Sequence, residues 1–436
     1  MSQIFLTYKG LLPLIPFVVA FLSVCWIHPR LVKLAYLKGI VDNPDFRKLQ
    51  RSPVPVLGGC AVFFGISLGL GIVSPFFDSS QLPIIMAAMT LMLYIGTMDD
   101  ILNLSPGFRF FVEVLCLVLL VVAGGFSISH FHGLWGIGAI PCWWCSALLT
   151  VFAAVGIINA INLIDGVNGL SSGYCIMACL IFGTFFFFAG DLVMVLLATV
   201  CVGALIPFFF HNVFGKSSRM FIGDGGTLVM GLVMSIFVIH TLDARSLGAV
   251  FAARGFGLIP FTLAVLSVPV FDTLRVMSAR VRRHVSPFHP DKTHLHHLFI
   301  DLGFSHIGTT FCILSLNAAV VVCLWALYAV GASVEVQLYA VVALSFLVTF
   351  GLYYFVRWNE RRRNRFYRFL LRLGRVSQFE RRAADDEECL FSRRIPAAEQ
   401  ELQDEHRVPQ RHHWCGDQLP ASRLYSQPTF ASGHES

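Results

Sequence analysis

The sequence predicts an all-α, polytopic integral membrane protein, and three observations support this prediction. Hydrophobic residues make up 56% of the 436 residues and charged residues only 13%, whereas about a quarter of the residues of soluble domains are charged. The mean hydropathy is +0.71. Apolar runs close to the length of about 20 residues that spans a bilayer recur along most of the chain. We therefore expect a bundle of membrane helices.

Eleven apolar runs predict about eleven transmembrane helices. They are expected near residues 11–27, 56–74, 82–98, 110–126, 141–160, 171–189, 192–210, 222–240, 257–278, 309–331 and 336–356. The first run has no small-residue cleavage site, which favours a retained helix over a cleaved signal peptide.

The positions of Lys and Arg predict the orientation. With a periplasmic N-terminus and eleven crossings, the outer loops hold only Lys9, Arg245 and Arg254, and all other basic clusters fall inside. Cytoplasmic loops are enriched in Lys and Arg, so the C-terminus is expected to be cytoplasmic. We therefore expect the chain to have three parts. These are a membrane region 1–356, a basic juxtamembrane segment 357–382 and a polar, disordered tail 383–436.

The segment 357–382 interleaves arginines with Phe, Tyr and Leu. Such a pattern directly after a membrane helix is typical of an amphipathic segment held by anionic lipids. Its placement argues against a nucleic-acid partner, although the net charge of +6 alone would allow one.

Polar residues concentrate at the inner ends of the predicted helices. The first group is the pair Asp99 and Asp100, followed by Asn103. Side chains of helix neighbours point about 100° apart, so one carboxylate is able to bind a metal while the other handles a proton. The alternative is a helix that simply ends in water, but acids are unfavourable at the negative end of the helix dipole.

The second group recurs every three residues in N-A-I-N-L-I-D-G-V-N, and consists of Asn159, Asn162, Asp165 and Asn168. This spacing lines up amides and a carboxylate along one side of a helical or tightly turned segment. Such groups suit the edges of a nucleobase or ribose. Hydrogen bonds between membrane helices are the structural alternative.

The third group is F-I-G-D-G-G-T, with Phe221 and Asp224 at the start of the eighth helix. A helix N-terminus offers free N–H groups to a phosphate, while an ordinary turn with an N-cap Asp is the alternative. Asp272 is a further membrane-embedded acid, for which an ion pair with Arg275 at helical spacing is expected.

The fourth group is the histidine-rich stretch from Phe288 to Ser305, which contains His294, His296 and His297. Hydrocarbon cannot solvate so many charges and donors. We therefore expect a polar loop at the membrane surface.

In their order along the chain, these motifs resemble those of the polyprenyl-phosphate N-acetylhexosamine-1-phosphate transferase superfamily. The resemblance runs from about Pro44 to about Ser305 and includes the first inner loop, R-K-L-Q-R-S-P-V-P-V-L-G-G. It is more specific than any single motif. The interrupted run H-L-H-H is more similar to the bacterial undecaprenyl-phosphate GlcNAc-1-phosphate transferase than to the phospho-MurNAc-pentapeptide translocase, whose histidine run is continuous.

The resemblance implies transfer of a sugar 1-phosphate from a UDP-HexNAc to undecaprenyl phosphate at the cytoplasmic face of a bacterial inner membrane. UMP would be released and Mg²⁺ would be the cofactor, with Mn²⁺ an alternative. The implied catalytic residues are Asp99, Asp100 and Asp224, and the implied metal ligands are Asp224 and Asp100. The implied substrate-binding residues are Arg51, Asn159, Asn162, Asp165, Asn168, Phe221, His294, His296 and His297.

Two positions depart from the family pattern, because Asn103 and Asn168 stand where many relatives carry acids. An amide keeps an acceptor and adds donors, but it cannot act as a base. The identity of the sugar stays open, with the pentapeptide translocase reaction and other N-acetylated or deoxy sugars as alternatives, as does a homodimer. A membrane transporter is the alternative from a different class, although transporters often show internal repeats, which this sequence lacks.

Overall fold

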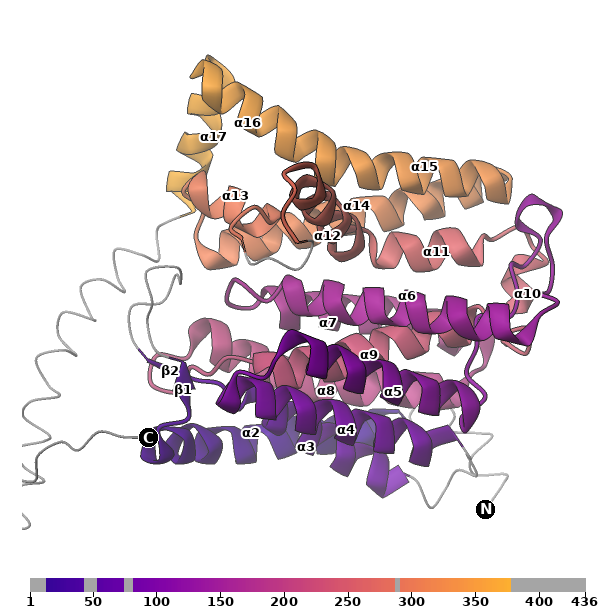
Figure 1. Ribbon diagram of the computed structural model, residues 1–436, viewed down its shortest axis with the longest axis horizontal. Helices are drawn as coiled ribbons and strands as arrows, with labels where there is room; N and C mark the ends of the chain where they lie inside the picture. Colours follow the sequence, from indigo (N-terminus) through magenta and orange to yellow (C-terminus); the bar gives the residue numbers. More distant parts are fainter. Residues whose placement is uncertain (1–12, 43–52, 74–80, 287–290, 378–436) are drawn as a thin grey trace, which may run out of the picture. The chain divides into compact units, whose positions relative to one another are not determined.

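A computed structural model describes residues 13–42, 53–73, 81–286 and 291–377. The described residues are overwhelmingly helical (Figure 1), which confirms the predicted all-α class. The strands β1 (Val41–Asp42) and β2 (Val54–Pro55) form a short antiparallel pair, and an isolated antiparallel bridge joins His130 to Ala139. Arg51, Phe288 and the tail 383–436 lie outside the described residues.

Each of the eleven predicted runs contains a helix. The helices before the histidine stretch are α2 (Leu14–Lys38), α3 (Gly58–Val73), α4 (Gln81–Leu102), α5 (Pro106–Val122), α6 (Trp143–Leu163), α7 (Leu170–Ala189), α8 (Leu192–Phe214), α9 (Gly223–Thr241), α10 (Ala249–Ala252), α11 (Leu258–Val265) and α12 (Ser267–Arg282). Those that follow are α13 (Leu295–Asp301), α14 (His306–Ala329), α15 (Val334–Phe346), α16 (Leu352–Arg362) and α17 (Arg365–Val376). A π-helical turn, Leu347–Gly351, joins α15 to α16.

Eight helices of the described part are long and apolar enough to cross a membrane, and α11 with α12 raises the number to nine if they form one span. The protein is therefore a multi-pass membrane protein. The apolar helix α3 is shorter, with 16 residues. The total of eleven crossings and the sides on which the termini lie stay predictions.

The segment predicted as one helix over 257–278 is broken, because α11 and α12 meet at an angle of 73°. Pro269 lacks an N–H group and cannot bond the carbonyl of Val265 four residues earlier. Tyr174 and Asn317 donate to that carbonyl instead, the latter at 3.0 Å. Side chains of α7 and α14 thus satisfy the backbone at the break, as a membrane interior requires.

Helix α9 lies at the centre of the bundle and is buried over most of its length. Glycines of two neighbouring helices allow it to be approached closely. A Cβ atom added at Gly96 of α4 would lie 2.6 Å from the carbonyl oxygen of Asp224, and one added at Gly59 of α3 would lie 2.2 Å from the nitrogen of Gly226. Small residues let membrane helices pack backbone to backbone. This packing brings the end of α4 to the start of α9.

Candidate active site

Asp100 joins the end of α4 to the start of α9. Its carboxylate accepts hydrogen bonds from the backbone N–H groups of Asp224, at 3.0 Å, and Gly225, at 3.2 Å. These N–H groups have no partner within their own helix. The residue before them, Gly223, has a φ of +68°, and a Cβ atom there would lie 2.5 Å from the Asp100 carboxylate. Glycine is therefore required at this position.

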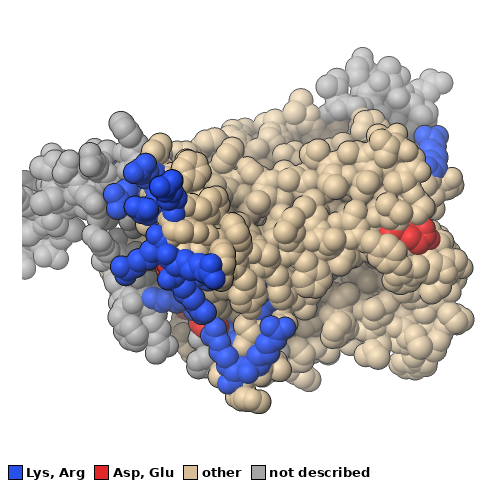
Figure 2. Space-filling view, turned by 90° about the horizontal axis from the view of Figure 1, so that it is seen from above, with Lys and Arg blue, Asp and Glu red and all other residues tan. Residues whose placement is uncertain are grey.

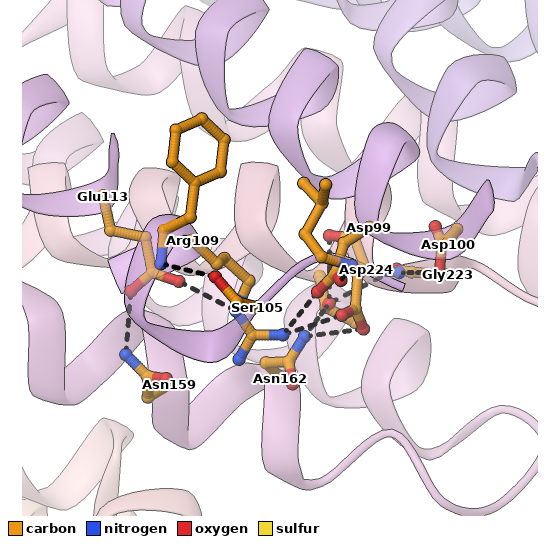
Figure 3. Close-up of polar contacts among 12 residues, drawn as sticks. Asp99, Asp100, Ser105, Arg109, Glu113, Asn159, Asn162, Gly223 and Asp224 are labelled. Atoms are coloured by element: carbon orange, nitrogen blue, oxygen red, sulfur yellow. Dashed lines mark hydrogen bonds and ion pairs between the residues drawn. The ribbon is translucent and has the colours of Figure 1, made fainter. Parts of the chain in front are cut away.

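Arg109 of α5 bridges three carboxylates (Figure 3). Its Nη1 atom lies 2.8 Å from Oδ2 of Asp224 and 3.0 Å from Oδ2 of Asp99, and its Nε atom lies 3.3 Å from Oε1 of Glu113. Glu113 is buried, and a buried carboxylate is costly without a cation or donors beside it. The guanidinium group therefore compensates the negative charge that α4, α5 and α9 bring together.

The asparagines of α6 complete this cluster. The amide nitrogen of Asn162 donates to Oδ1 of Asp224 at 3.0 Å and to the hydroxyl oxygen of Thr227 at 2.9 Å. One helical turn earlier, Asn159 donates to Oε2 of Glu113 at 2.9 Å. The predicted spacing of three residues thus places both amides on the acidic cluster, and they orient its carboxylates.

Asp165 lies in the turn between α6 and α7, where its Oδ1 atom accepts a hydrogen bond from the hydroxyl of Ser171 at 2.5 Å. The residue is exposed to solvent on one side. The protein atoms packed around its carboxyl nevertheless raise its pKa to about 6, an effect that Ser171 opposes and the charge of Asp224 reinforces. Asp165 therefore belongs electrostatically to the same cluster as Asp224.

The turn that carries Asp165 also contacts the histidine helix α13. A Cβ atom added at Gly166 would lie 2.2 Å from Nε2 of His296, so this imidazole rests against the turn. The next polar residue, Asn168, is bound through its backbone, because its N–H donates to Nδ1 of His306 at 3.2 Å and its carbonyl accepts from Thr310 at 3.2 Å.

A buried network orients the first histidine of the motif. Oδ1 of Asp272 accepts from Nη2 of Arg275 at 2.7 Å, which confirms the predicted ion pair. Its Oδ2 atom lies 3.0 Å from Nδ1 of His294 and 3.1 Å from the backbone nitrogen of Leu295. The guanidinium of Arg275 stacks 3.8 Å above the ring of Tyr353 in α16. Because an ionised carboxylate only accepts, Nδ1 of His294 carries the proton.

The other two histidines stack beside His294. The rings of His294 and His296 are 5.6 Å apart and nearly parallel, at 5°, and the ring of His297 is 4.3 Å from that of His296. Burial, and then the neighbouring imidazoles His297 and His294, lower the pKa of His296 well below its usual value. Burial also lowers the pKa of His297. His296 is therefore neutral near neutral pH.

Phe221 and Asn103 have visible backbone roles. The N–H group of Phe221 donates to the carbonyl of Pro55 at 2.8 Å, and its own carbonyl accepts from Gly58 at 3.0 Å. Asn103 follows the last residue of α4 with a φ of +51°, a left-handed conformation that asparagine tolerates better than most residues. Arg51, which is implied as a substrate-binding residue, lies outside the described residues.

Sequence reasoning missed the central cation of the site. Neither Arg109 nor Glu113 was among the residues predicted for the site. Their spacing of four residues near the start of an apolar helix was the available signal, since such residues share a helix face. Nothing in the local sequence indicated that this face meets Asp99 and Asp224.

The carboxylate oxygens of the cluster are suitable ligands for a divalent cation such as Mg²⁺. Carboxylate oxygens of Asp99 and Asp224 face the same guanidinium nitrogen, so both are already directed at one positive charge. Mg²⁺ is commonly bound by one or two carboxylates together with substrate phosphates. Among the described residues no three His, Cys, Asp or Glu side chains are grouped to hold a metal by themselves.

The fold and the site define a multi-pass helical membrane protein in which the ends of α4, α6 and α9 converge on an acidic, arginine-bridged centre. The model of glycosyl transferase family 4 matches residues 82–242, a range that contains this centre. Together with the relatives described next, this match supports the predicted resemblance to the polyprenyl-phosphate N-acetylhexosamine-1-phosphate transferase superfamily.

Three curated relatives carry the same description, undecaprenyl-phosphate alpha-N-acetylglucosaminyl 1-phosphate transferase. The proteins of Escherichia coli strain K12 and Salmonella typhi are 27% and 28% identical to this chain over 330 residues, which is 74% of this chain and 84% of each relative. The protein of Yersinia pestis is 28% identical over 297 residues, 66% of this chain and 76% of the relative.

Proposed function

We propose that this protein transfers a HexNAc 1-phosphate, namely GlcNAc 1-phosphate, from a UDP-sugar to undecaprenyl phosphate and releases UMP. The observation that carries the proposal is the convergence of Asp99, Arg109 and Asp224 beside the turn of Asp165. The descriptions of the relatives support undecaprenyl phosphate as the acceptor and GlcNAc 1-phosphate as the transferred group. The reaction takes place at the cytoplasmic face of a bacterial inner membrane, and its product initiates a cell-surface polysaccharide.

In this reaction an oxygen of the lipid phosphate attacks the phosphorus atom attached to the sugar. The bond from that phosphorus to the bridging oxygen breaks, and the electron pair leaves with UMP. Both reactants are anions, so the site has to reduce repulsion and stabilise charge on the leaving group. Two sets of donors serve this purpose, the guanidinium of Arg109 and the imidazoles of α13.

Asp224 and Asp99 are the residues that would hold Mg²⁺, which supplies positive charge to neutralise the pyrophosphate of the donor. The geometry favours Asp99 over Asp100 as the second ligand. Asp99 and Asp224 both form an ion pair with Nη1 of Arg109. By contrast, both carboxylate oxygens of Asp100 accept hydrogen bonds from backbone N–H groups of α9. In this proposal Asp100 positions Asp224, and Asn162 fixes the rotamer of its carboxylate.

The turn of Asp165 and the helix α13 form the donor side of the site. Asp165 accepts hydroxyl or imide hydrogens of the uridine, for which its ionised form is suited. Since Nδ1 of His294 is engaged by Asp272, Nε2 is the ring nitrogen that faces the diphosphate. His296, neutral near neutral pH, contributes a hydrogen bond rather than a charge.

The test is product formation by membranes that contain the protein. We expect a mild-acid-labile lipid diphosphate from radiolabelled UDP-GlcNAc, undecaprenyl phosphate and Mg²⁺, and none from Asp224→Asn. Glu335→Gln is the matched control, because it makes the same carboxylate-to-amide change at a partly exposed residue of α15 that is not part of the acidic cluster, and it should keep full activity.

Two outcomes contradict the proposal. Product formation by Asp224→Asn at the wild-type rate would exclude Asp224 as a metal ligand. Absence of product across a panel of UDP-sugars, including the UDP-MurNAc pentapeptide, would exclude the transferase and return the transporter as the better hypothesis.

A further inference from the structure

Helix α17, Arg365–Val376, divides its surface into three sectors. With about 3.6 residues per turn, one sector holds Tyr367, Leu370, Leu371 and Gly374. A second sector holds Phe366, Phe369, Leu373 and Val376. The third holds Arg365, Arg368, Arg372 and Arg375. The first sector is partly or fully buried, and the other two are exposed.

The first sector docks α17 onto the junction of α13 and α14. A Cβ atom added at Gly374 would lie 2.2 Å from the carbonyl oxygen of Leu302. At the end of α17, the hydroxyl of Ser377 accepts a hydrogen bond from the N–H of Ser305 at 3.0 Å. Arg357 of α16 adds an ion pair with Asp301, the last residue of α13, at 2.6 Å. The end of the histidine helix is thus held by the C-terminal helices.

The second sector is an apolar stripe that protein covers little. Phe369 is 54% exposed and Val376 is 75% exposed. The ring of Phe366 contacts Phe355 of α16, which is itself 49% exposed. A stripe of this kind on a helix surface marks a contact with lipid or another molecule.

The arginines of the third sector indicate whether lipid or another molecule covers the apolar stripe. Within the described residues, none of its four arginines forms an ion pair or hydrogen bond with an acidic side chain. An apolar stripe flanked by arginines is the pattern of a helix that lies in the membrane interface, with its apolar side chains at the acyl boundary and its guanidinium groups among lipid phosphates.

The position of α17 agrees with this arrangement. It follows α16, the end of the last apolar helix unit Val334–Arg362, and Figure 1 shows it running across the direction of the long helices. Figure 2 shows Lys and Arg side chains gathered at this end of the molecule, whereas the flank of the bundle lacks them. A leaflet rich in anionic lipids is the complementary surface.

We propose that α17 binds the anionic lipid leaflet and that this contact holds the histidine helix α13 in place. The occupant of the stripe is the lipid surface itself, not a second copy of the chain. Because α17 contacts the junction of α13 and α14 through Gly374 and Ser377, loss of the lipid contact loosens the segment that carries His294, His296 and His297. The proposal is independent of the reaction that these histidines serve.

Hydrogen exchange of the full-length protein in nanodiscs tests the proposal. One set contains phosphatidylcholine alone, and the other contains phosphatidylcholine mixed with phosphatidylglycerol. We expect slower exchange over residues 365–376 and over residues 295–301 in the mixture. Replacement of Arg365, Arg368, Arg372 and Arg375 by Gln should abolish this difference. Arg282→Gln with Arg283→Gln, which removes exposed arginines at the end of α12, should preserve it.

Salt gives a second measurement on the unaltered chain, because screening weakens the attraction of arginines to lipid phosphates. Raising the NaCl concentration should therefore remove the protection in the mixture. Equal exchange of α17 in both lipid compositions would overturn the lipid contact. Protection of α17 without protection of α13 would overturn the link between them. Protection that requires a high protein-to-lipid ratio would assign the stripe to a second copy.

Discussion

Oδ2 of Asp272 lies 3.0 Å from Nδ1 of His294, and Oδ1 of the same carboxylate is bound by Arg275. One buried carboxylate thus fixes the tautomer of the first motif histidine and neutralises a guanidinium that is 0% exposed. The orientation of His294 therefore depends on residues of α12 and, through Tyr353, of α16.

Asp272→Asn should destabilise the protein by about 3–5 kcal/mol, because removing one partner of a buried ion pair leaves the other charge uncompensated. Thermal unfolding in detergent measures the loss, and the transferase rate should fall with it. Asp301→Asn breaks a pair with Arg357 at a carboxylate that is 52% exposed and should cost far less. Equal losses for the two variants would contradict a special role of Asp272.

Tyr353→Leu should lower stability by about 0.5–2 kcal/mol, the range of a cation–π contact. Tyr353→Phe keeps the ring over Arg275 and should stay close to the wild type. Tyr354→Leu, at the exposed neighbouring position, is the control for loss of a tyrosine. A fall in stability with Tyr353→Phe as large as with Tyr353→Leu would mean that the hydroxyl, not the ring, matters.

Arg109→Gln removes the cation that bridges Asp99, Glu113 and Asp224. The remaining carboxylates repel one another, so the variant should be less stable in EDTA and should gain more thermal stability from Mg²⁺ than the wild type does. The melting temperature with and without Mg²⁺ measures this difference. An identical gain in both proteins would exclude a shared cation position.

The pKa of Asp165 predicts a dependence of stability on pH. The protein atoms packed around its carboxyl raise its pKa from 3.8 to about 6, so the folded state holds the proton more tightly than the unfolded state. The stabilising contribution of this group is complete below 3.8 and is lost as the pH rises toward 6. Asp165→Asn should therefore flatten the stability profile over this window and raise stability above it. Chemical unfolding at a series of pH values measures the slope, and an unchanged slope would contradict the raised pKa.

Gly166→Ala should displace the imidazole of His296, since the new Cβ atom would lie 2.2 Å from its Nε2. We expect a large loss of transferase rate and a loss of about 1–3 kcal/mol in stability, the usual cost of overpacking. Gly156→Ala in α6 is the matched control, because no atom lies within 4 Å of the added Cβ there. A wild-type rate for Gly166→Ala would show that the turn does not constrain His296.

The sequence predicted the positions of the helices well because apolar length is a local property. Each of the eleven runs contains a helix, and the break at Leu266 was missed because its stability depends on Tyr174 and Asn317, which lie far away in the chain. Pro269 was the local signal for a break. Prolines also occur in continuous membrane helices, however, such as α8, which contains Pro207.

The residues of the site were predictable as motifs, whereas their mutual contacts were not. The local patterns around Asp224 and Asp165 indicated ligand-binding residues. The bridging position of Arg109 and the use of Asp100 as a cap for α9 depend on packing between α4, α5 and α9, which no local pattern reveals. Asp272 was correctly predicted to pair with Arg275, but its contact with His294 spans 22 residues and includes a loop.

The bond between Asp100 and the start of α9 joins residues that are 124 positions apart. Since the ribosome delivers α4 long before α9, a nascent chain carries Asp99, Asp100, Arg109 and Glu113 into the membrane without their later partners. The centre can close only after α9 has been synthesised and inserted. Until then Asp100 lacks the N–H groups of Asp224 and Gly225 that bind it in the finished molecule.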